Sequence, residues 1–209
     1  MSGQLRTRWW LVWFGSAALL IALSFGFDGA VQKWFEEVQT PALRTFMRQV
    51  TRWGDWPTHV ALGLLGAGIA YARKQHAWLI IFLAMVLSCA VAGSVNRVVK
   101  MTAGRSRPSV EVDVGWNGPR LGSKYHAFAS GHTAATTAFF GTLLLARRRL
   151  GLALLPLPLL IATSRLYLNA HHLSDVVAGG VLGFLCAALT WHLVRSRSGF
   201  LLESRSVRA

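Results

Sequence analysis

Six long apolar runs, separated by short polar loops, constrain this chain more than any other feature of its sequence. The runs cover residues 11–27, 56–72, 77–98, 129–146, 151–167 and 173–194. Because a helix rises about 1.5 Å per residue, runs of this length approach or cross the roughly 30 Å hydrocarbon core of a bilayer. The pattern predicts an all-α integral membrane protein, a six-transmembrane-helix bundle formed by residues 1–209 as a single domain.

Composition agrees with a membrane protein, because 53% of the residues are hydrophobic and nine are Trp. The formal net charge is +14, but the basic residues are split into small groups by apolar runs, which argues against a nucleic-acid partner. Cys89 and Cys186 lie within apolar runs and predict neither a disulfide framework nor a thiol enzyme. The first run favours a retained helix over a cleaved signal peptide, since Phe25-Gly26-Phe27 is a poor cleavage site.

Basic residues in the short loops predict the orientation of the chain. They are Arg73-Lys74, Arg147-Arg148-Arg149, and Arg195 with Arg197. By the positive-inside rule these loops are cytoplasmic, as are both termini. We therefore expect a multi-pass protein of the bacterial inner membrane, with the loop of residues 99–128 facing the periplasm or exterior.

The stretch between the first two runs, residues 28–55, differs from the rest because apolar residues recur in it at near-helical spacing between charges. This pattern predicts an interfacial amphipathic helical segment between the first and second spans. It is open whether the segment is a cap packed over the bundle or a surface that guides lipids to a site.

Polar residues cluster in three segments at the predicted outer ends of the spans. They are Lys100 with Arg107-Pro108, then Ser130-Gly131-His132, then Ser164-Arg165 followed by His171 and Asp175. Cations near hydrocarbon need an anionic partner, and phosphate suits both the fork of an Arg and the point charge of a Lys. A helix start at Ser130-Gly131 would add backbone N–H groups that bind anions. Together the segments predict a phosphate site.

The chemistry follows from two histidines. His171 and Asp175 are four residues apart and would share one helix face, so the carboxylate could orient the ring and leave its other nitrogen free to attack phosphorus. His132 could protonate the departing oxygen and later activate water. Taken alone, the His171–Asp175 pair and the Ser130-Gly131-His132 segment each favour a structural role. Arg105 is interpreted as an interface anchor.

The spacing of these residues over 100–175 resembles the signature of the type 2 phosphatidic acid phosphatase family. The three matching patterns are Lys-x6-Arg-Pro, Ser-Gly-His and Ser-Arg-x5-His-x3-Asp. The resemblance implies a six-helix bundle that dephosphorylates lipid phosphates or pyrophosphates without a metal. It implies that Lys100, Arg107 and Arg165 bind phosphate, with Ser130 and Gly131 contributing. It also implies that His132 is the acid/base, His171 the nucleophile and Asp175 its orienting partner. The sequence departs from the family pattern at two positions. The family usually has Pro where this chain has Ala129, and many bacterial relatives have Pro where it has Leu173.

Other functions fit the sequence less well. A metal site built from His126, His172 and their neighbours lacks ligand spacing, so no cofactor is expected. An intramembrane serine protease using Ser130, or a small transporter, leaves the three cations unexplained. Transfer of the phosphoryl group to another lipid would use the same site and stays open.

The partners expected are a lipid phosphate and membrane lipids, with no obligatory protein partner. Undecaprenyl pyrophosphate, phosphatidylglycerol phosphate, phosphatidic acid and the phosphate of lipid A are candidate substrates. Four loop residues are candidates for headgroup selection or for interface anchoring, namely Trp116, Arg120, Lys124 and Tyr125.

Overall fold

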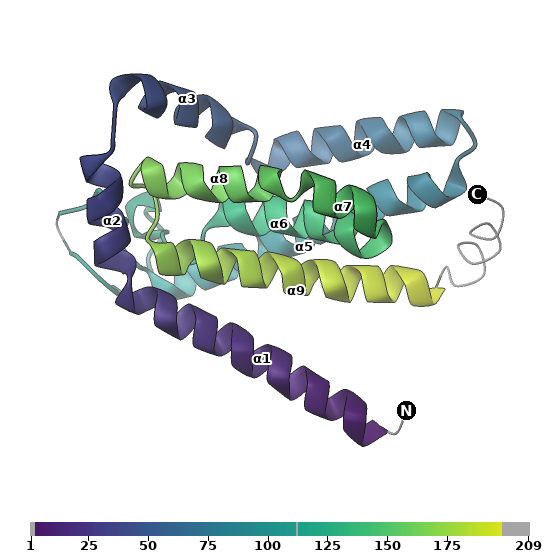
Figure 1. Ribbon diagram of the computed structural model, residues 1–209, viewed down its shortest axis with the longest axis horizontal. Helices are drawn as coiled ribbons and strands as arrows, with labels where there is room; N and C mark the ends of the chain where they lie inside the picture. The colour runs from purple at the N-terminus through teal and green to yellow at the C-terminus, as the bar shows by residue number, and fades with distance from the viewer. Residues whose placement is uncertain (1–2, 112, 198–209) are drawn as a thin grey trace.

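The computed structural model describes residues 3–111 and 113–197, and most of these residues are helical. Figure 1 shows the helices α1 to α9. Their bounds are α1 Gly3–Gly26, α2 Asp28–Glu37, α3 Pro41–Arg52, α4 Trp56–Ala72, α5 His76–Ala103, α6 Gly131–Ala146, α7 Arg148–Leu154, α8 Pro156–Tyr167 and α9 Leu173–Arg197. The loop between α5 and α6 contains a short 3₁₀ turn, Ser123–Tyr125, and a single β-bridge between Arg105 and Trp116.

Helices α5, α6 and α9 pack on one another at the centre of the bundle, with α4 against α5 and α8 against α6. Helix α1 contacts α9 near the end that carries α2 and diverges from the bundle toward its own start (Figure 1). The core between α5 and α6 is formed by Ile81, Met85, Phe139 and Leu143. The apolar faces predicted from the sequence thus lie against one another or point outward, as expected for an all-α membrane fold.

The membrane spans agree with the sequence prediction only in part. By length and composition, three described stretches could cross a membrane, namely α5, residues 148–167 (α7 with α8) and α9. A fourth is possible if residues 11–26 and α2, bent by 55°, count as one span. Helices α4 and α6 have 17 and 16 residues, or about 24–26 Å at 1.5 Å per residue, which is short of the hydrocarbon core.

The predicted boundaries also shift for local physical reasons. Helix α6 begins at Gly131 because Ser130, its N-cap, has an extended backbone. The fifth run is divided into α7 and α8 at Pro156, whose ring nitrogen cannot donate to the preceding turn. Helix α5 continues to Ala103 and ends at Gly104, which has a left-handed φ of 58° that favours glycine.

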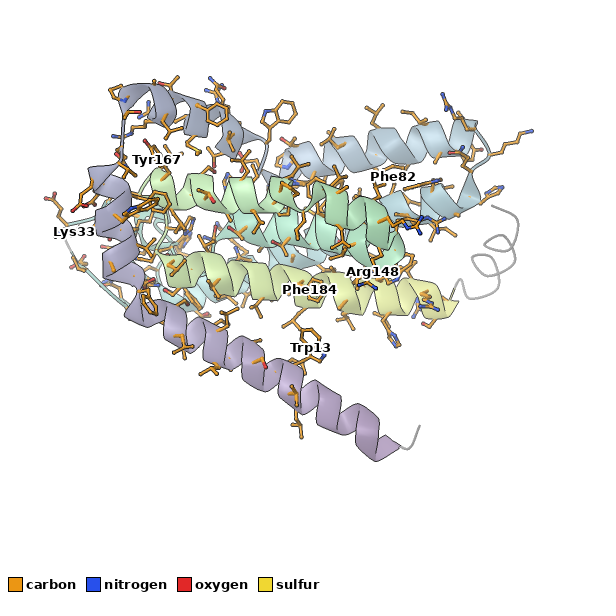
Figure 2. The ribbon with its side chains drawn as sticks, in the orientation of Figure 1. Trp13, Lys33, Phe82, Arg148, Tyr167 and Phe184 are labelled. Carbon is orange, nitrogen blue, oxygen red and sulfur yellow. The ribbon has the colours of Figure 1, made fainter. Side chains whose placement is uncertain are left out.

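The amphipathic stretch of residues 28–55 forms α2 and α3, and both pack against α8. Their buried residues Phe35 and Met47 cluster with Tyr167, which Figure 2 shows where α2 and α3 meet the end of α8. Trp34 and Trp53 remain exposed. The segment is therefore a helical cap over the bundle that also presents aromatic side chains outward.

Helices α6 and α9 approach closely at two glycines of α9. A Cβ atom added to Gly179 would lie 2.6 Å from the Ser130 carbonyl oxygen, and one added to Gly183 would lie 2.3 Å from that of Ala134. Small residues allow such close helix contacts in membrane proteins. The Gly-x-x-x-Gly spacing of these residues therefore serves packing within the chain.

We predict that Gly183→Ala destabilises the protein, whereas Gly180→Ala does not. The added methyl group at residue 183 has no space beside the α6 backbone, while at residue 180 the nearest atom, Thr133 Cγ2, is 3.9 Å away. Overpacking of this kind costs about 1–3 kcal/mol. Thermal unfolding of both variants in detergent measures the difference, and equal midpoints would contradict the close packing.

Candidate active site

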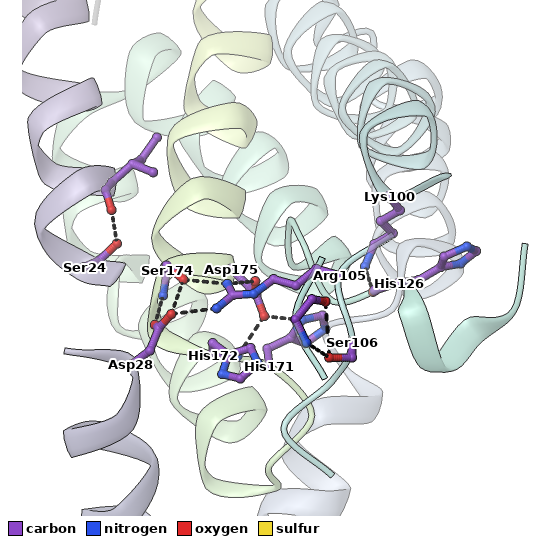
Figure 3. Close-up of polar contacts among 12 residues, drawn as sticks. Ser24, Asp28, Lys100, Arg105, Ser106, His126, His171, His172, Ser174 and Asp175 are labelled. Carbon is purple, nitrogen blue, oxygen red and sulfur yellow. Dashed lines mark hydrogen bonds and ion pairs between the residues drawn. The ribbon is translucent and has the colours of Figure 1, made fainter. Parts of the chain in front are cut away.

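The three polar segments meet at one end of the bundle. Lys100 lies in the last turn of α5, Ser130 and His132 at the start of α6, and Arg165 in the last turn of α8. His171 lies in the connection from α8 to α9, and Asp175 in the first turn of α9. Figure 3 shows His171 and Asp175 at the start of α9, with Lys100 to one side at the end of α5. Segments 75 residues apart in the sequence are thus brought together because they all occupy helix ends on the same side of the bundle.

His171 and Asp175 lie side by side, but the expected hydrogen bond between them is not closed. His171 Nδ1 is 3.6 Å from Asp175 Oδ2, and this nitrogen has no hydrogen-bond partner. The same oxygen accepts a hydrogen bond of 2.8 Å from the His172 backbone N–H. Catalytic hydrogen bonds are often long without substrate and shorten when it binds. Burial lowers the pKa of His171 to about 3, so its ring is neutral at neutral pH and has a lone pair to donate.

Arg165 is a buried cation with no carboxylate within 4.0 Å among the described residues, although Asp55 lies near enough to attract it. Its side chain is 8% exposed, Nη1 donates to the Thr51 hydroxyl at 2.7 Å, and Nε has no partner. A buried charge is costly unless it is paired and hydrogen-bonded. The guanidinium is therefore arranged to receive an anion that is not part of the described chain.

Lys100 and Arg107 add two positive charges beside Arg165. Lys100 Nζ donates to the His126 carbonyl oxygen at 2.6 Å, and Arg107 Nε donates to that of Ser123 at 3.2 Å. The three cations are close enough to repel one another, and burial lowers the pKa of Arg107. Within residues 3–111 and 113–197, none of them has a carboxylate within 4.0 Å. The arrangement is that of an anion site.

The start of α6 faces the same site with its backbone. The first bond within the helix runs from the Ala134 N–H to the Ser130 carbonyl oxygen, so the N–H groups of residues 131–133 precede the helical hydrogen bonds and can bind an anion. A Cβ added to Gly131 would lie 3.5 Å from Lys100 Cε. The Ser130 N–H donates to the Asp175 carbonyl oxygen at 2.8 Å, which joins the start of α6 to α9.

His132 has a carboxylate partner that sequence reasoning missed. Its Nε2 is 3.1 Å from Asp55 Oδ1, and Asp55 is the N-cap residue of α4. A carboxylate at this distance can accept a hydrogen bond from the imidazole N–H and so orient the ring. The N-cap pattern Asp55-Trp56-Pro57 was visible in the sequence and predicts a helix start, but nothing in it indicates contact with a residue 77 positions away.

The structure contradicts the interpretation of Arg105 as an interface anchor. It is 7% exposed and forms ion pairs of 2.6 Å with Asp175 and 2.7 Å with Asp28 (Figure 3). It also donates to the Ser174 hydroxyl at 2.7 Å. Asp28 in turn accepts hydrogen bonds from the Ser174 N–H and hydroxyl. The interpretation was wrong because the loop after α5 folds inward between α2 and α9 and carries Arg105 with it.

Two aromatic rings enclose the Arg105 guanidinium. Its Cζ lies 5.1 Å from the ring centre of Phe25 and 5.2 Å from that of Trp116, a geometry in which the π faces stabilise a cation. Trp116 thus contributes to holding Arg105. The side chains of Arg120 and Lys124 lie over the ring of Tyr125, whose hydroxyl donates to Asp113 at 2.5 Å, so this loop is internally braced.

The structure thus has an all-α membrane fold in which buried cations and two histidines, each with a carboxylate nearby, meet at one end. Residues 77–198 match the PAP2 superfamily. The chain belongs to this superfamily.

Two curated relatives share 31% identity with this chain. The decaprenylphosphoryl-5-phosphoribose phosphatase of Mycobacterium tuberculosis aligns over 73% of this chain and 81% of its own length. The lipid A 1-phosphatase of Rhizobium johnstonii aligns over 54% of this chain, and the chain spans about half (47%) of the length of that relative.

Two solved structures share the fold at lower sequence identity. The phosphatidylglycerolphosphate phosphatase of Bacillus subtilis has a TM-score of 0.64 at 22% identity, covering 89% of this chain and 96% of that one. LpxE of Aquifex aeolicus has a TM-score of 0.57 at 17% identity, covering 79% and 95%. Asp28, Thr51 and Asp55 lie outside residues 77–198, so the N-terminal helices supply polar contacts to the region that the family match covers.

We predict that Arg105→Gln strongly reduces both stability and any activity of the site, because it leaves two carboxylates buried without their cation. Removing one partner of a buried ion pair typically costs about 3–5 kcal/mol. Arg44→Gln, which changes an exposed residue of α3, is the matched control and should behave as the unmodified protein. Thermal unfolding in detergent distinguishes the two, and an Arg105→Gln protein as stable as the control would restore the anchor interpretation.

Proposed function

We propose that this protein is a lipid phosphatase that cleaves a lipid phosphate or pyrophosphate through a phosphohistidine on His171 and releases inorganic phosphate. The observation that carries the proposal is the buried Arg165, whose Nε lacks a partner, next to Lys100 and Arg107 and across from two histidines. A phosphate dianion would satisfy all three cations and stabilise the charge of the transferring group.

In the first step the neutral His171 attacks phosphorus with Nε2 while its Nδ1–H donates to Asp175. The bond between phosphorus and the lipid oxygen breaks, and His132 donates a proton to that oxygen. Arg165, Arg107 and Lys100 bind the equatorial oxygens. Asp175 holds the ring in the tautomer with a free Nε2 and compensates the positive charge that forms on it.

In the second step water attacks the phosphohistidine. His132, now neutral, takes a proton from the water as the new P–O bond forms, and the N–P bond to His171 breaks. Inorganic phosphate leaves, and His132 is protonated again for the next cycle. Asp55, whose Oδ1 lies 3.1 Å from His132 Nε2, would orient the ring during this cycle.

A cavity of about 540 Å³ opens beside the site and supports a lipid substrate. From Lys100 and His132 it follows α5 past Gly93 to Ala90 and Cys89, a distance of about 16 Å at 1.5 Å per residue. Its far end is apolar, as a lipid tail requires. The names of the relatives agree with a phosphorylated lipid. For this chain the candidates stay undecaprenyl pyrophosphate, phosphatidylglycerol phosphate, phosphatidic acid and lipid A phosphate.

We also propose a topology of six spans in one domain of the bacterial inner membrane, with both termini cytoplasmic. Support comes from Arg73-Lys74 between α4 and α5 and from Arg147-Arg148-Arg149 at the start of α7, which lie at the end of the bundle opposite the site (Figure 1). The site would then face the periplasm or exterior, and α4 and α6 would cross the membrane despite their shortness because shorter spans thin the bilayer locally.

The test is inorganic phosphate release by the detergent-purified protein from the four candidate lipids, with a chelator present. We expect release by the wild type and a loss of at least about 10³-fold in His171→Ala, since the proposed mechanism forms its covalent intermediate on this residue. Full activity of His171→Ala would exclude covalent catalysis by this residue. The control is His192→Ala, which removes a histidine of α9 away from the site. It should keep wild-type activity after the same purification. Loss of lipid phosphate without release of inorganic phosphate would instead indicate phosphotransfer to another lipid.

A further inference from the structure

We propose that Asp28 is a positioning residue for the nucleophile His171, with its carboxylate fixing the start of α9 and offsetting the charge of Arg105. The inference rests on the proposed function and adds to it a residue outside residues 77–198, the part of the chain that matches the family. Asp28 begins α2, the helix that follows the 55° bend after α1. It therefore reaches the site from a helix that carries none of the motif residues.

Asp28 caps α9 from outside that helix. Its Oδ1 accepts a hydrogen bond of 2.8 Å from the backbone N–H of Ser174, the second residue of α9 (Figure 3). The first N–H groups of a helix have no partner within the helix, and the helix dipole favours a carboxylate beside them. Asp175 satisfies another N–H at the same helix start, since its Oδ2 accepts from the His172 backbone. The two carboxylates together fix the turn that joins His171 to α9.

Asp28 also balances the guanidinium that holds Asp175. Arg105 Nη1 is 2.6 Å from Asp175 Oδ1, and its Nη2 is 2.7 Å from Asp28 Oδ2. The side chains of Arg105, Asp28 and Asp175 are 9%, 12% and 0% exposed, so salt and water screen these charges little. Without the charge of Asp28, the remaining guanidinium and carboxylate would form a neutral pair. A neutral pair compensates less of the positive charge that forms on His171 when this residue attacks phosphorus.

Ser174 makes it possible to separate the charge of Asp28 from the hydrogen bonds around it. The Ser174 hydroxyl donates to Asp28 Oδ2 at 2.6 Å and accepts from Arg105 Nη1 at 2.7 Å, and the residue is 0% exposed. Ser174→Ala removes both of these hydrogen bonds and leaves every charge in place. Asp28→Asn removes the charge but keeps an amide oxygen that can accept from the Ser174 backbone N–H. The two substitutions therefore test different contributions of one buried cluster.

The experiment measures kcat and KM for a lipid phosphate that the wild type consumes. Asp28→Asn should lower kcat by about tenfold or more, as expected for loss of a charge-assisted contact. KM should stay within about twofold, because the hydrogen bonds of Asp28 go to Ser174 and Arg105 rather than to the proposed phosphate ligands. Ser174→Ala should lower kcat by less than about threefold. Glu37→Gln, which removes an exposed carboxylate from the same helix α2, is the control and should match the wild type.

Equal losses of kcat in Asp28→Asn and Ser174→Ala would overturn the proposal, as would an unchanged kcat in Asp28→Asn or a loss that appears only in KM. A second readout, thermal unfolding in detergent, does not depend on turnover. Adding Asp28→Asn to Arg105→Gln should raise the unfolding temperature, since the double variant buries one uncompensated carboxylate instead of two. A further decrease in the double variant would overturn the charge balance. If the folded wild type consumes no lipid phosphate, the proposed function fails, while the unfolding measurement still decides whether Asp28 offsets Arg105.

Discussion

The paired ion contacts of Arg105 are the interaction on which the site most depends. The guanidinium joins the start of α2, through Asp28, to the first turn of α9, through Asp175, and it reaches both from the loop that follows α5. Two buried carboxylates and one guanidinium leave a formal net charge of one negative unit in this cluster. Asp175 is thereby held in place by Arg105 while its other oxygen remains directed at the His172 N–H and the His171 ring.

On each side of the site a histidine lies next to a carboxylate. On one side His171 lies next to Asp175, and on the other His132 lies next to Asp55. Lys100 and Arg165 act electrostatically on both histidines, so in the proposed mechanism a phosphoryl group bound to these cations would meet His171 as nucleophile and His132 as proton donor. Asp28 and Asp55 lie N-terminal to residues 77–198, the part of the chain that matches the family. Their carboxylates contact Arg105 and His132, which lie within that part. The cap of α2 and α3 is therefore part of the polar architecture of the site.

Much of this arrangement could be predicted from the sequence, and the failures have physical causes. Apolar runs predicted the helices because helix length in a membrane follows from bilayer thickness, and motif spacing indicated which helix ends would meet. The polar contacts made by Arg105, Asp28 and Asp55 could not be predicted, since a charge next to an apolar run looks the same whether it faces water or turns inward. Pro156, which divides the fifth run, was visible, but its effect on span number depends on how α7 and α8 align.

Direct detection of the covalent intermediate tests the central claim. The purified protein would be mixed with a lipid phosphate that it consumes, quenched rapidly at alkaline pH, where phosphohistidine is stable, and analysed by peptide mass spectrometry. The account predicts a phosphoryl group on His171 that appears and decays with turnover. Turnover with no phosphorylated residue, or with the phosphoryl group on His132 or on a serine, would contradict it.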